Sequence, residues 1–79
     1  MRYDRPTKRS LTLRGHRTSV SLEAEFWDAF RGIAAKEGVA LNALAARIDA
    51  ERGLECGLAS AIRLFVLRWF QSREDGFAK

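Results

Sequence analysis

Residues 17–48, RTSVSLEAEFWDAFRGIAAKEGVALNALAARI, contain a change in the period of the apolar side chains. Polar and apolar residues alternate at the start, with Val20 and Leu22 on one side and Arg17, Ser19 and Ser21 on the other. Strict alternation over a short run is typical of a half-buried β-strand. The start of this stretch therefore predicts a strand with one apolar face and one polar face.

Three helices are predicted after this strand. Apolar residues recur at helical spacing at Phe26, Trp27, Phe30, Ile33 and Ala34. Gly38 ends this first helix, since glycine adopts the left-handed conformation common at helix C-termini. A second helix is expected from about Leu41 to Arg52, and a third from Leu58 to about Ser72.

The segment before residue 17 changes the phase of the alternation. Leu11 and Leu13 are odd-numbered whereas Val20 and Leu22 are even-numbered, so a regular strand would send the two pairs to opposite faces. A bulge or kink at Gly15 would reset the phase. A hairpin with Gly15 at the first central turn position would do the same. We favour the bulge slightly and leave both open; either one gives an apolar face and a polar, basic face.

The apolar content indicates an association between chains. Apolar residues make up 47% of only 79 residues, and the third helix is apolar around most of its girth. A small chain with so much apolar surface is expected to complete its core with a second copy, as an obligate homodimer. The side chains expected to be mostly buried in the dimer are Phe26, Phe30, Ile33, Leu44, Ile48, Ile62, Phe65 and Trp69. We divide the chain into a flexible basic arm at 1–9, one domain at 10–72 and a polar tail at 73–79.

The positive charge is concentrated at the N-terminus. Residues 1–22 contain six basic residues and one acidic residue, a net charge of +5, whereas residues 23–79 contain eight basic and nine acidic residues, a net charge of −1. A basic arm on a nearly neutral body is typical of nucleic-acid binding, although a solvated tail would have the same composition.

Several classes of function are disfavoured. Cys56 is the single cysteine, so no disulfide forms within the chain and no metal cluster of the cysteine type is expected. His16 is the single histidine and has no nucleophile or acid arranged around it. The apolar stretch at 58–70 is too short to span a membrane, and no signal peptide is recognisable. We expect a cytoplasmic protein that is not an enzyme, with no cofactor and no metal.

The stretch RTSVSLEAEFWDAFRGIAAKEGVALNALAARI resembles the ribbon-helix-helix repressors of the Arc and MetJ type over about residues 10–52. More specifically, KRSLTLRGHRTSVSLEAEFWDAF with the later LASAIRLFVL looks like a bacterial subfamily of short proteins with an extra C-terminal helix. The resemblance implies an α+β, mostly helical fold. Its form would be an intertwined dimer with an intermolecular antiparallel β-ribbon that enters the major groove.

Candidate DNA contacts follow from the two faces of the strand. Arg17, Ser19 and Ser21 are expected to contact base edges, since Arg binds guanine and Ser donates to or accepts from several bases. The residues expected to contact phosphates are Lys8, Arg9, Arg14 and Asn42. In the family a Ser often begins the second helix, whereas only Asn42 offers a polar side chain there, so helix capping is an equal alternative.

The sequence therefore predicts a homodimeric protein that binds double-stranded DNA and acts as a transcriptional repressor. One alternative is a protein-interaction module, such as an antitoxin whose C-terminal helix binds a partner protein. Another is a three-helix helix-turn-helix domain with a basic arm, which the alternation in residues 10–22 disfavours.

Overall fold

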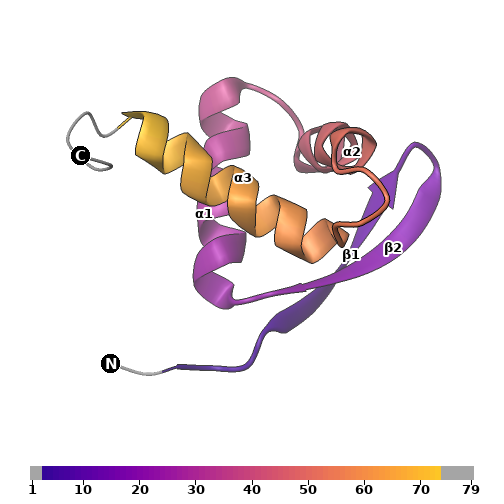
Figure 1. Ribbon diagram of the computed structural model, residues 1–79, viewed down its shortest axis with the longest axis horizontal. Coiled ribbons are helices and arrows are strands. Elements are labelled where there is room, and N and C mark those ends of the chain that lie inside the picture. Colours follow the sequence, from indigo (N-terminus) through magenta and orange to yellow (C-terminus); the bar gives the residue numbers. More distant parts are fainter. Residues whose placement is uncertain (1–2, 74–79) are drawn as a thin grey trace.

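The computed structural model describes residues 3–73, which form a two-stranded antiparallel sheet followed by three helices (Figure 1). The elements are β1 (Thr7–Leu13), β2 (His16–Leu22), α1 (Ala24–Glu37), α2 (Leu41–Glu51) and α3 (Leu58–Arg73). The α+β, mostly helical fold and the order of strand and helices are as predicted, and the helix ends lie within one or two residues of those expected. None of the helices within residues 3–73 is long and apolar enough to cross a membrane.

A tight hairpin joins the two strands. Leu13 pairs with His16, so Arg14 and Gly15 are the two central residues of the turn. Both have positive φ, 51° and 84°, which is the requirement of a type I′ turn. The preference for a bulge at Gly15 was therefore wrong. The hairpin alternative placed Gly15 at the first central position of the turn. In the structure Gly15 occupies the second central position, so the turn lies one residue earlier than that alternative expected.

The ribbon is complete within one chain. The family resemblance implied a ribbon made from the strands of two chains, whereas β1 pairs with β2 of the same chain along its whole length. The structure contains a single chain, so pairing between copies stays a prediction. β1 begins at Thr7, which places residues 7–9 of the expected arm in the sheet.

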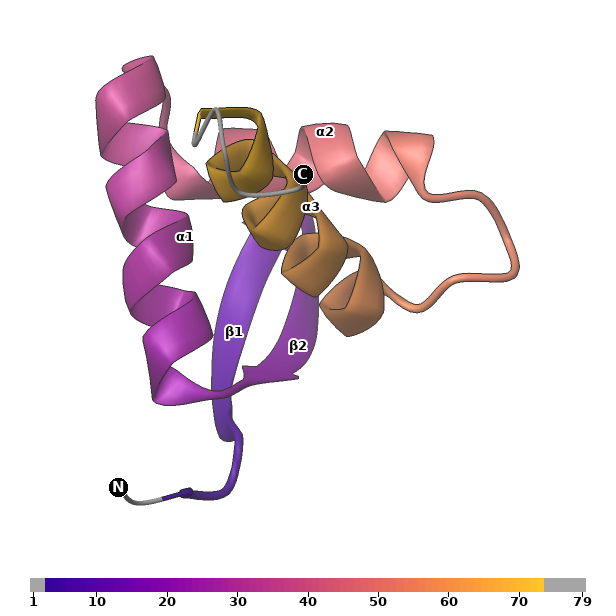
Figure 2. The ribbon, with the colours of Figure 1, turned by 60° about the vertical axis from the view of Figure 1, so that its left-hand side comes forward.

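The core lies between the hairpin and the helices. The inner face of the hairpin buries Leu11, Leu13, Val20 and Leu22, and the three helices lie on that side of the sheet (Figure 2). Of the eight side chains expected to be buried, five are buried in the single chain: Phe30, Ile33, Leu44, Ile48 and Ile62. Phe26, Phe65 and Trp69 are only partly buried and pack against this core.

An ion pair connects the end of the hairpin to α3. Glu23 is the N-cap residue of α1 and directly follows β2. Arg63 of α3 donates from Nε to the Glu23 carboxylate at 2.9 Å and from Nη2 to the backbone oxygen of Ser21 at 3.4 Å. The hydrogen bond from Arg63 lowers the pKa of the Glu23 carboxyl below its usual value.

Candidate nucleic-acid interface

The outer face of the hairpin carries only polar side chains. Arg17, Ser19 and Ser21 of β2 alternate with the buried residues and so point away from the core. Arg17 and Ser19 are exposed and Ser21 is partly buried. The structure therefore places the three side chains expected to contact bases together on one surface, on the far side of the sheet from the helices.

The first strand contributes equally to this surface, as the hairpin alternative implied for Ser10 and Thr12. Three further side chains, Lys8, Ser10 and Thr12, are exposed and lie opposite Ser21, Ser19 and Arg17, respectively. Cross-strand partners in an antiparallel sheet share a face, so all six belong to one surface. The alternation in residues 7–13 contained this signal, but its meaning depended on the pairing partner. We call these six residues the outer face.

Two of the expected phosphate contacts lie at the edges of the outer face. Arg14 occupies the tip of the hairpin and is exposed. Asn42 lies in the first turn of α2, and its Oδ1 accepts a hydrogen bond from the backbone N–H of Thr12 at 3.4 Å. Ala40 is the N-cap residue of α2 and provides no side-chain cap. The contact to Thr12 therefore brings the uncapped N-terminus of α2 beside β1.

Arg9 and Lys8 were both expected to contact phosphates, but they lie on opposite faces of the hairpin. Arg9 pairs with Val20 on the side of the hairpin that faces the helices, and its guanidinium lies 5.9 Å from the ring centroid of Trp27. The Trp27 indole N–H in turn donates to the backbone oxygen of Thr7 at 2.8 Å. Lys8 is on the outer face. Of the two, only Lys8 lies beside the residues expected to contact bases.

Comparisons with known proteins agree with this architecture. The sequence profile of the ribbon-helix-helix domain family matches residues 6–70. The chain is also similar in structure to an uncharacterized protein from Bordetella pertussis Tohama I, with 36% sequence identity and a TM-score of 0.76. The match covers 90% of this chain and 60% of the Bordetella chain. The curated proteins contain no match.

The family match spans the hairpin and all but the last residues of α3, so it includes the outer face and the elements that support it. Proteins of this family generally bind DNA as transcription regulators, and the fold is regulatory rather than catalytic. From the match over residues 6–70 and the strand and helix order that the structure shows, this chain belongs to the ribbon-helix-helix domain family.

Proposed function

We propose that this protein is a sequence-specific DNA-binding repressor that inserts the outer face of its hairpin into the major groove. The observation that carries the proposal is the composition of that face: one Arg, one Lys and four hydroxyl side chains. Arg and Lys bind the O6 and N7 atoms of guanine, and hydroxyl groups donate to or accept from several bases. A two-stranded ribbon also has the dimensions that the major groove admits.

The surroundings of the outer face suit the phosphate backbone. Arg14 at the hairpin tip would contact phosphate on one side of the groove. The N-terminus of α2, which Asn42 holds beside β1, presents free backbone N–H groups that favour an anion. The basic residues that precede β1 add long-range attraction, because residues 1–22 have a net charge of +5. A repressor acts where the bacterial chromosome lies, so we place this protein in the cytoplasm, without a cofactor.

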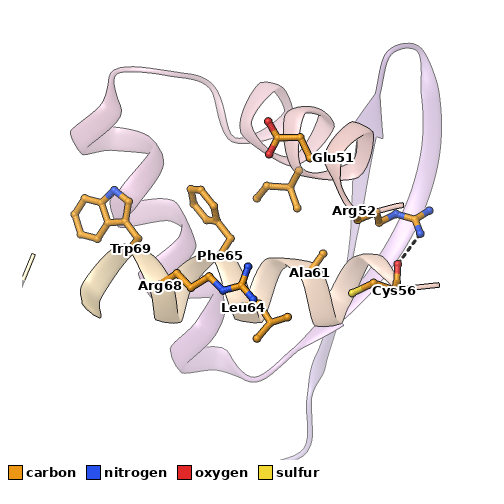
Figure 3. Close-up of a pocket in the computed structure, with 9 residues that line it drawn as sticks. Glu51, Arg52, Cys56, Ala61, Leu64, Phe65, Arg68 and Trp69 are labelled. Carbon is orange, nitrogen blue, oxygen red and sulfur yellow. Dashed lines mark hydrogen bonds between the residues drawn. The ribbon is translucent and has the colours of Figure 1, made fainter. Parts of the chain in front are cut away.

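We also propose that two copies associate through α2 and α3. A groove of about 480 Å³ lies between these helices, with Phe65 and Trp69 among the side chains that line it (Figure 3). Leu64 lies at the rim and is 42% exposed. Glu51 of α2 and Arg68 of α3 also line the groove, and neither forms an ion pair within residues 3–73. Opposite charges on one surface suit a two-fold interface, in which each copy's Glu51 meets the other's Arg68.

The same groove is the observation that supports the alternative function, a module that binds another protein. The charge pattern of the groove is complementary to itself, which favours a second copy as the occupant. If the chain binds no second copy of itself but binds a different protein through α3, the protein-interaction module is supported instead.

The experiment that tests DNA binding compares two variants of one chain on two duplexes. A duplex is first selected from a random pool with the wild type and then compared with its scrambled sequence. Arg17→Ala should weaken binding to the selected duplex by roughly 1–3 kcal/mol and reduce the preference for it over the scrambled one. Lys36→Ala is the matched control, since Lys36 is an exposed basic residue in the last turn of α1.

The isotherms distinguish the roles that Arg17 could have. An equal loss on both duplexes would show that Arg17 contacts phosphate, and the outer face would then not read bases at that position. Absence of any preference by the wild type would contradict sequence-specific binding itself.

A further inference from the structure

The two strands of the hairpin are near repeats of each other. Residues 8–13 are KRSLTL and residues 17–22 are RTSVSL. Compared position by position, five of the six pairs are identical or similar: Lys8 and Arg17, Ser10 and Ser19, Leu11 and Val20, Thr12 and Ser21, Leu13 and Leu22. The exception is Arg9 and Thr18.

The pairing register turns this repeat into a symmetry. Ser10 lies opposite Ser19. An antiparallel pair has a local two-fold axis perpendicular to the sheet between two opposite residues. The axis between Ser10 and Ser19 exchanges the two strands in the same alignment as the repeat, so it places Lys8 onto Arg17 and Thr12 onto Ser21.

This symmetry is confined to the ribbon. On the outer face the axis exchanges a basic residue with a basic residue and a hydroxyl with a hydroxyl. On the inner face it exchanges Leu11 with Val20 and Leu13 with Leu22, all of them buried. Arg9 and Thr18, which break the repeat, are not on the outer face. The three helices on the inner side follow no such two-fold arrangement.

We infer that one chain presents both halves of a two-fold symmetric reading surface, and that Lys8, Ser10 and Thr12 determine specificity at base pairs symmetric to those that Arg17, Ser19 and Ser21 contact. The inference rests on the proposed DNA binding. The matching ligand is a short inverted repeat in duplex DNA, because such a sequence has a two-fold axis of its own. A basic side chain at each end of the ribbon would bind a guanine in each half of the repeat.

A ribbon assembled from the β2 strands of two chains would make a different surface. Arg17 would then occupy both symmetric ends, and Lys8 would occupy neither. The role of Lys8 in base preference therefore separates a ribbon made by one chain from a ribbon made by two.

The test uses the full chain on the selected inverted repeat and on duplexes altered at one end or at both ends. An alteration at one end should weaken the wild type roughly 5- to 150-fold, the range expected for one basic contact to guanine. Lys8→Ala and Arg17→Ala should each bind the selected duplex more weakly. Each variant should then bind the duplex altered at one end almost as tightly as it binds the selected duplex. The two-fold axis lets the chain bind in either of two orientations, so the truncated side chain can lie over the altered base pair.

Lys36→Ala, the exposed basic control on α1, should retain the wild-type penalty for the one-end alteration. The inference is overturned if Lys8→Ala also retains the full penalty while Arg17→Ala loses it. A wild type that prefers no duplex over a scrambled one would remove the proposed function and this inference together. A wild type that prefers a site without inverted symmetry would remove the inference alone.

A cross-link tests the strand pairing without DNA. The backbone N–H of Thr12 donates to Asn42 and not to β2, so Thr12–Arg17 and, by alternation, Ser10–Ser19 are non-hydrogen-bonded pairs. The Cα separation of about 4.5 Å in such pairs is compatible with a disulfide. Ser10→Cys with Ser19→Cys, in a Cys56→Ser background, should oxidise to a species of one-chain mass on a non-reducing gel. Efficient linkage of two chains by Ser19→Cys alone would overturn the inference.

Discussion

Arg14 adopts a left-handed backbone conformation in a turn that suits another residue better. Its φ is 51°, and the residue most favoured before glycine in a type I′ turn is asparagine. We expect Arg14→Asn to raise the free energy of unfolding by about 1 kcal/mol. The same change should weaken binding to selected and scrambled duplexes alike and reduce the salt dependence by about one phosphate contact.

Thermal melts and isotherms at several salt concentrations measure the two effects of Arg14→Asn separately. Gly15→Ala is the comparison, since it strains the same turn without a change in charge. If Arg14→Asn stabilises the fold but leaves the salt dependence unchanged, Arg14 makes no phosphate contact.

At the level of elements, the pair formed by Glu23 and Arg63 connects the start of α1 to α3. The pKa of Glu23 is lower in the folded chain than in the unfolded chain, so the folded chain binds fewer protons. The contribution of this pair to stability is therefore fully present above the ordinary carboxyl pKa and is lost as the pH falls through the lowered pKa. Melting temperatures should fall less between about pH 5 and pH 3 in Glu23→Gln than in the wild type.

Glu55→Gln provides the matched control for this pH dependence, because Glu55 is exposed in the connection between α2 and α3. Its pH profile should follow that of the wild type. Identical profiles for Glu23→Gln and the wild type would show that the ion pair does not persist in solution.

The packing of α1 against the rest of the molecule depends on Phe30. Its side chain is fully buried, and its ring lies 6.5 Å from that of Trp27 and 6.4 Å from that of Phe65, measured between centroids. Phe30→Ala should lower the free energy of unfolding by about 3–5 kcal/mol, since it removes a large side chain from a packed core. Phe70→Ala removes the same atoms from a 44% exposed position and should cost far less. Denaturant melts that shift equally for both would contradict the burial described here.

For the whole molecule, the structure changes the reason to expect a dimer. The family resemblance implied a ribbon made by two chains, but β1 pairs with β2 within the chain. The reasons that remain are the apolar surface of α3 and the exposed groove between α2 and α3. The wild type should sediment as a dimer at micromolar concentration. Leu64→Glu should shift it towards the monomer, because the change places a charge at the rim of an apolar interface.

Ala35→Glu adds the same charge at an exposed position of α1 and should leave the dimer intact. A wild type that sediments as a folded monomer would contradict the dimer. The DNA-binding surface proposed for each chain would be unaffected by that result, since its six residues come from one hairpin.

Local patterns in the sequence were sufficient to predict much of this protein. The alternation around Val20 predicted β2 and its two faces, and so brought Arg17, Ser19 and Ser21 together on one surface. The helical spacing from Phe26 to Ala34 and the stop at Gly38 predicted α1. These features depend on a residue and its near neighbours in the chain, because strand and helix periods are local properties.

Only the tertiary structure decided which residues lie opposite one another. The phase change at residues 14–16 was visible, but a bulge and a hairpin both explained it. The φ angles of Arg14 and Gly15, with side chains of β1 and β2 buried in one core, selected the hairpin. The pairing register then placed Lys8, Ser10 and Thr12 beside Arg17, Ser19 and Ser21, and Arg9 over Trp27. A register joins residues that are distant in the chain, and its free energy comes from the shared core beneath the sheet, which no local pattern contains.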